Sequence, residues 1–146
     1  MTPEKARKDT VSTMLIGRWE QACAKLAALA EAFPEDRFES RPANGVRTGG
    51  DVLRHLAFWN RYVADTARGK KADDSANELP KEDYPTKARV LAALEQSAAD
   101  ATAALRETDA RNTELLVSFL EHTSEHYGQL VIYARLNGIV PPASRS

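Results

Sequence analysis

Four stretches of the chain carry apolar residues at alternating steps of four and three, and this spacing constrains the fold most. The first stretch shows it over six positions: Leu15, Trp19, Ala22, Leu26, Leu29 and Phe33. Residues at such steps lie on one face of an α-helix, so each stretch predicts an amphipathic helix. Val and Ile are sparse and never alternate with polar residues over the length of a strand. The pattern therefore predicts an all-α protein.

Residue types that begin or end helices mark the expected bounds of the first two. Pro3 suits a first helical turn, and Pro34 stops the helix that follows it. The second helix follows residues 48–51, Thr-Gly-Gly-Asp, and ends near Gly69. Its inward stripe consists of Val52, Leu56, Trp59 and Val63.

Capping residues place the third and fourth helices in the same way. Thr86 can cap the third helix. Its apolar stripe is Leu91, Leu94, Ala98, Ala101 and Leu105. Asn112 or Thr113 opens the fourth helix, which runs to a stop at Asn137 and Gly138.

Four amphipathic helices of this kind predict a four-helix bundle, formed as one domain over residues 1–146. The connections at residues 34–50 and 70–85 are long for a bundle, where about 2–8 residues are usual. Long connections allow a crossover topology. The second connection is rich in Asp, Glu, Lys and Pro, which favours a solvated surface loop over a lid.

Composition and charge exclude several classes of protein. Twenty Lys and Arg residues against 21 Asp and Glu give a net charge of −1, which disfavours nucleic-acid binding. Cys23 is the single cysteine, so no disulfide framework is expected, and its place beside the apolar seam predicts a packing role. The charged first ten residues do not resemble a signal peptide, and no apolar run suits a membrane span. We therefore expect a cytoplasmic protein.

The fourth helix departs from the apolar pattern. Its inward positions, counted in the same steps, are Leu115, Phe119, His122, His126, Gln129, Tyr133 and Leu136. Three consecutive positions are therefore polar, and burying imidazoles and an amide costs free energy unless each finds a partner. His122 and His126 stack one turn apart on this face. The sequence thus predicts a polar site inside the bundle.

The second helix offers a further histidine to this site. His55 shares a 3-4-3 series with Val52, Trp59 and Tyr62, so it lies on or beside the buried face. Two imidazoles one turn apart and a third from a facing helix are compatible with a metal site. Three imidazoles with an open fourth position favour zinc, although nickel, iron and copper also accept this ligand. The alternative is that each histidine is a core residue bonded to a carbonyl or carboxylate.

Other residues near this site carry two interpretations each. Trp59 is either a core residue or part of a pocket above the histidines. Gln129 either orients a metal ligand or forms a hydrogen bond between helices. Gly128 in mid-helix indicates close approach by a neighbouring backbone, for example across a dimer. Residues 122–126 match the H-x-x-E-H pattern of certain zinc proteases, but a chain of 146 residues is too small for that substrate cleft.

Two segments resemble a known family. Residues 51–62, DVLRHLAFWNRY, and residues 125–144, EHYGQLVIYARLNGIVPPAS, are similar to the DinB/YfiT-like family of small four-helix proteins. The resemblance implies a metal triad of His55, His122 and His126, a divalent ion such as zinc or nickel, and often a homodimer. Many relatives have a second histidine where this chain has Tyr127, which puts any role of that position in doubt.

The resemblance also implies a class of activity. Some relatives are thiol-dependent S-transferases or isomerases that use low-molecular-weight bacterial thiols, so we expect a metal- and thiol-dependent transferase with a small-molecule substrate. Two alternatives stay open. One is a non-catalytic, dimeric, stress-associated bundle with a structural metal site. The other is a metal-dependent hydrolase, although Glu121 and Glu125 each point about 100° away from the adjoining histidine.

Overall fold

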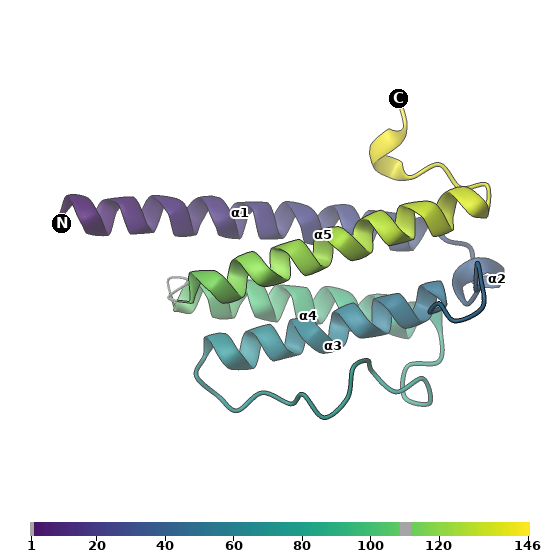
Figure 1. Cartoon of the computed structure of the whole chain (residues 1–146), viewed down its shortest axis with the longest axis horizontal. Coiled ribbons are helices and arrows are strands. Elements are labelled where there is room, and N and C mark those ends of the chain that lie inside the picture. The colour runs from purple at the N-terminus through teal and green to yellow at the C-terminus, as the bar shows by residue number, and fades with distance from the viewer. Residues whose placement is uncertain (1, 109–111) are drawn as a thin grey trace.

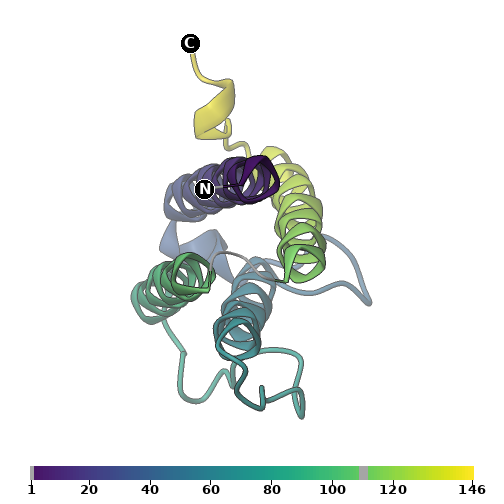
Figure 2. The ribbon, with the colours of Figure 1, turned by 90° about the vertical axis from the view of Figure 1, so that its left-hand side faces the viewer.

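The computed structural model describes residues 2–108 and 112–146, and within these ranges every regular element is helical. The elements are α1 (Pro3–Ala32), α2 (Glu35–Phe38), α3 (Gly49–Ala67), α4 (Lys87–Glu107), α5 (Thr113–Leu136) and the 3-10 turn η1 (Pro142–Ser144). The four long helices lie side by side as a bundle (Figures 1 and 2). This confirms the all-α bundle that the spacing predicts.

Helix ends fall where the capping residues place them. The side chains of Thr48, Thr86 and Asn112 each accept a hydrogen bond from the backbone N–H three residues further on. Gly69 and Gly138 follow α3 and α5 with φ of 75° and 72°, the left-handed conformation that glycine adopts without strain. These bounds confirm the predicted helices within one or two residues.

The connection between α3 and α4 determines the topology. Figure 1 shows that it runs back along the bundle, so α3 and α4 point in the same direction while α1 and α5 point the opposite way. This is the crossover arrangement that the long connection allows. The segment is mostly exposed, but Leu79 is only 3% exposed and its N–H donates to the carbonyl of Arg54 at 3.2 Å.

The first connection contains features that the spacing does not predict. The single-turn helix α2 is too short to show a helical period, and its Phe38 is buried. The start of α3 approaches this segment closely, because a Cβ added to Gly50 would lie 2.4 Å from Oε1 of Glu39. Glycine at this position therefore lets the two segments meet.

A buried arginine joins both connections to α3. The side chain of Arg54 is fully buried, and its guanidinium pairs with the carboxylates of Glu39 and Asp51. Its Nε also donates to the carbonyl of Tyr84 at 2.9 Å. The pKa of Arg54 is raised, because these hydrogen bonds and negative charges outweigh the opposing effect of burial. Sequence spacing gives no sign of this contact.

The buried face of α5 differs from the predicted stripe. Leu116, Thr123, Leu130 and Ala134 are at most 2% exposed, whereas Leu136, predicted to face inward, is 68% exposed. The reason is that α5 packs against both α1 and α3. The centre of its buried face is therefore displaced by one residue from the predicted series that contains the histidines. His122 and His126 consequently lie at the border of this face and are partly exposed. Among the described residues, no helix has the length and apolarity that crossing a membrane requires.

Candidate metal centre

The structure brings the three histidines of the chain together. His55 extends from α3, while His122 and His126 extend from consecutive turns of α5. One ring nitrogen from each lies within 4.8 Å of the others, and the Nε2 atoms of His55 and His122 are 2.9 Å apart. His55 is 6% exposed. A contact between two side chains 67 positions apart in sequence depends on how α3 and α5 pack.

A backbone carbonyl orients His55. Its Nδ1 lies 2.6 Å from the carbonyl oxygen of Asn77, so Nδ1 carries a proton and donates it. The Nε2 atom then presents a lone pair to Nε2 of His122. Two ring nitrogens in this position attract each other only when a proton or a cation lies between them.

The donor set suits a divalent cation. Two imidazole nitrogens on a tetrahedral zinc ion, each about 2.0–2.1 Å from the metal, are about 3.3 Å apart. The observed separation of 2.9 Å differs from this by a few tenths of an ångström. This pair of nitrogens therefore fits one ion with little rearrangement, and the His126 nitrogen, which lies within 4.8 Å of both, would move closer to complete the set.

Gln129 orients the third histidine through a chain of hydrogen bonds. Nδ1 of His126 lies 2.8 Å from Oε1 of Gln129, and Nε2 of Gln129 donates to the hydroxyl of Tyr133 at 3.0 Å. That hydroxyl donates to the carbonyl of Arg47 at 2.8 Å. Both hydrogen bonds of the Gln129 side chain are to residues of α5, so they do not join two helices. One of these partners is His126, whose ring Gln129 can orient. Such outer partners fix the ring and its tautomer.

Aromatic side chains form one side of the site. The rings of Trp59, Tyr62 and Phe119 lie 5.0–6.1 Å from one another between centroids, and Phe119 is 5.6 Å from His122. The indole N–H of Trp59 donates to the side-chain oxygen of Asn77 at 2.9 Å. Trp59 is partly exposed, packs against the core and lies 6.5 Å from His55 between ring centroids. Asn77, which holds both His55 and Trp59, carries no sequence signal.

Burial and charge keep two of the rings neutral. Burial lowers the pKa of His55 to about 4, opposed by the bond to Asn77 and assisted by the positive charge of Arg47. Burial also lowers the pKa of His122 to about 4, assisted by His126, His55 and Arg47. Both imidazoles are therefore neutral at pH 7, with one ring nitrogen free of a proton, which is the form that binds a metal.

In the metal-free protein, we expect stability to fall as the pH drops from about 6.5 to 5. The pKa of His55 and His122 is about 4 in the fold and 6.5 without it, so the unfolded chain binds protons first as the pH falls. The free energy of unfolding should fall by about 2 kcal/mol. This is less than the sum for two independent buried rings, because the two rings interact and His122 is partly exposed. Urea unfolding of chelator-treated protein at the two pH values measures it. A His122→Gln variant should lose less of its free energy of unfolding between the two pH values. An equal loss in the variant and the wild type would contradict the assignment.

Other candidate residues lie away from the triad. Glu121 and Glu125 are exposed, so the glutamate of the H-x-x-E-H match does not join the cluster. Gly128 is exposed, and a Cβ added there would meet nothing within 4 Å. The expected close approach at Gly128 is therefore not made by any described segment of this chain. Cys23 is partly buried and lines a separate cavity in the bundle.

The comparison with family models agrees with the fold. The model of the DinB superfamily matches residues 18–130. The chain belongs to the DinB superfamily. The matched range contains all three histidines, and this DinB-superfamily chain places them at one point between α3 and α5. None of the curated proteins matches the chain.

Proposed function

We propose that His55, His122 and His126 bind one divalent ion, zinc or nickel, and that the loaded protein is a metal- and thiol-dependent transferase. The observation that carries the metal site is the pair of facing Nε2 atoms 2.9 Å apart, with the His126 donor in the same group. Oriented, neutral imidazoles from two helices are the ligand set that such an ion requires.

Access to the triad supports a reactive site over a structural one. A structural zinc ion is enclosed by four protein ligands, whereas a catalytic ion keeps one position for water or substrate. This chain offers three clustered ligands in its described residues, and His122 and His126 are partly exposed. This partial exposure is the observation that favours access for an external small molecule.

The surroundings of the triad favour a substrate with negative charge. Arg47 lies close enough to influence both His55 and His122 electrostatically. Its Nε forms a long ion pair with Glu78 at 4.0 Å, so this carboxylate offsets part of its charge without a hydrogen bond to it. The aromatic cluster of Trp59, Tyr62 and Phe119 reduces the contact of the site with water. A small thiol that carries a carboxylate would match this combination of charge and apolar surface.

The ligand chemistry favours a thiol over a water molecule as the nucleophile. A bound divalent cation would supply positive charge that lowers the pKa of a nearby thiol. The thiol proton then leaves to solvent, the sulfur bonds to an electrophilic carbon, and the leaving group departs with the bonding electrons. Hydrolysis by a metal-bound hydroxide would be helped by a general base near the cluster, and the exposed Glu121 and Glu125 do not supply one there.

Adding cysteine or glutathione to the zinc-loaded chain, with 1-chloro-2,4-dinitrobenzene as the electrophile, tests the transferase. We expect the S-arylation rate to exceed that of chelator-treated protein at least about tenfold, and His122→Ala to abolish this excess. Cobalt-loaded protein should also change its absorption when the thiol is added. Equal rates with and without metal, and an unchanged cobalt spectrum, would favour the structural metal site instead.

A second copy of the chain belongs to the same proposal. Ile132 and Leu136 are 58% and 68% exposed, and they share one face of α5 with Gly128, which lies four residues before Ile132. An apolar helical face with a glycine can receive another helix closely. This face supports the homodimer that the family resemblance implies.

A further inference from the structure

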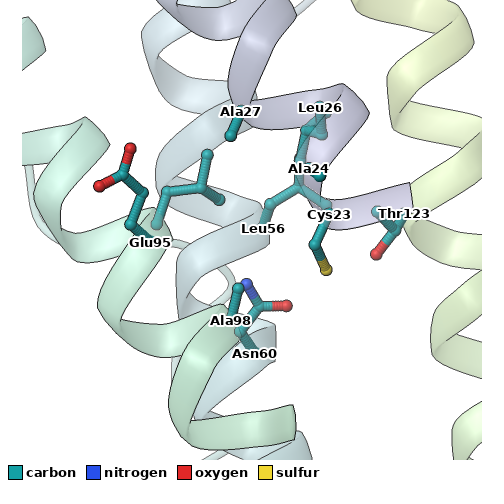
Figure 3. A pocket seen from close by; sticks show the side chains of 10 residues that line it. Cys23, Ala24, Leu26, Ala27, Leu56, Asn60, Glu95, Ala98 and Thr123 are labelled. Atoms are coloured by element: carbon teal, nitrogen blue, oxygen red, sulfur yellow. The ribbon is translucent and has the colours of Figure 1, made fainter. Parts of the chain in front are cut away.

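A cavity of about 180 Å³ lies inside the bundle and has no assigned role. Side chains from α1, α3, α4 and α5 line it (Figure 3). Leu26, Leu56 and Leu94 give it an apolar wall, and each is at most 3% exposed. Leu56 follows His55 and Thr123 follows His122 in sequence, so the cavity and the metal centre use different faces of the same two helices.

One end of the cavity is polar. Thr123 is 2% exposed, and its hydroxyl has no hydrogen-bond partner in the described part of the chain. Asn60 is 4% exposed and donates its amide to the hydroxyl of Ser97 at 3.2 Å. Its carbonyl oxygen is turned towards Cys23, and all three side chains converge in Figure 3. The Thr123 hydroxyl can therefore donate or accept a hydrogen bond with a molecule that enters this end of the cavity.

The polar groups at this end are neutral. Burial, with a smaller contribution from the negative charge of Glu20, raises the pKa of the Cys23 thiol to about 12. Cys23 therefore stays protonated, and together with Thr123 and Asn60 it offers donors and an acceptor without charge. Glu95 also lines the cavity, but it is exposed and lies at the rim. The lining thus suits a neutral molecule.

The cavity opens between α1 and α4. Its lining residues on α3 and α5 are buried, whereas Ala24 and Glu95 are exposed and Ala27 and Ala98 are partly exposed. Three alanines around the opening leave room for a small molecule to pass. An apolar cavity of about 150 Å³ holds one benzene molecule, so this cavity has room for a single ring with a substituent.

We propose that this cavity is a binding site for a small, neutral, mostly apolar molecule that carries one hydrogen-bonding group, as a phenol or a short alcohol does. The apolar part lies against the three leucines, and the polar group pairs with Thr123 and Asn60. The site is distinct from the metal centre and does not depend on it.

Phenol and benzene are the probes that test this site, with binding to the full chain followed by NMR titration. Phenol should bind saturably, with shifts at residues that line the cavity. Ala98→Leu, which fills the cavity, should weaken phenol binding at least about tenfold, whereas Ala99→Leu on the exposed face should change it less than about twofold. Thr123→Val should weaken phenol about threefold to tenfold and leave benzene within about twofold.

Several results would overturn the proposal. One is the absence of phenol-induced shifts at the cavity, which would mean that water alone fills it. Another is equal phenol affinity in Ala98→Leu and the wild-type chain, or in Thr123→Val and the wild-type chain. Unfolding curves establish that each variant folds. If Ala98→Leu does not fold, Cys23→Leu fills the same cavity from α1 and carries the same expectation.

Discussion

Replacing His122 and His126 together with alanine will abolish stoichiometric metal binding. After dialysis against zinc or nickel, we expect about one ion per wild-type chain and less than about a tenth of an ion in the variant. The physical reason is that His55 alone keeps one imidazole, which cannot hold a divalent ion against water. Metal analysis by inductively coupled plasma mass spectrometry measures the difference, and circular dichroism establishes that the variant is helical.

Two variants of the same helix sharpen this result. Glu125→Gln changes an exposed neighbour of His126 and should keep the full metal content. Gln129→Leu removes the group that bonds to Nδ1 of His126 and should weaken affinity about 10–100-fold without abolishing it. Equal metal content in the wild type and in the double histidine variant would refute the assignment of the ligands.

Arg54→Met will destabilise the fold by about 3 kcal/mol. The arginine side chain is fully buried, and its removal leaves the carboxylates of Glu39 and Asp51 without their cation and the carbonyl of Tyr84 without a donor. Breaking a buried ion pair costs about 3–5 kcal/mol, and the partial exposure of the two carboxylates places this case at the lower end. Urea unfolding at pH 7 measures the loss.

The matched control lies two turns further along α3. Arg61→Met removes an exposed arginine that bonds to the hydroxyl of Tyr84, so its cost should stay below about 1 kcal/mol. The pKa of Glu39 provides a second check. Burial opposes ionisation, but the bonds with Arg54 and Thr48 prevail and lower this pKa, so their contribution is present above about pH 4.5 and is lost in acid. Similar losses of unfolding free energy in both arginine variants would show that the buried ion pairs of Arg54 contribute no more than an exposed contact.

Helices and histidines are the parts of this molecule that local sequence rules predict. Apolar spacing and capping residues depend on neighbours within a few positions, and Thr48, Thr86 and Asn112 act as caps in the fold. The spacing places His55, His122 and His126 on inward faces of two helices, which is compatible with a shared site, but their meeting depends on how α3 and α5 pack.

The residues that sequence patterns do not reveal act through long-range contacts. Asn77 orients His55 from a connection without periodicity, and Arg54 is a charged residue that only its partners allow in the core. The predicted rotation of α5 is also wrong by one step, because the helix packs against two neighbours and the stripe with the histidines is not its centre. Leu136 is exposed for the same reason.

The junction between α3 and α5 packs less extensively than the junctions of α3 with α4 and of α1 with α5, and the histidines lie across it. A metal ion bound there would act as a removable crosslink between segments 67 residues apart. Unlike a disulfide, it is released when the chain unfolds, so its effect grows with the free metal concentration, by about 2.7 kcal/mol at one hundred times the dissociation constant. The free energy of unfolding of this bundle would then depend on the supply of metal as well as on the sequence.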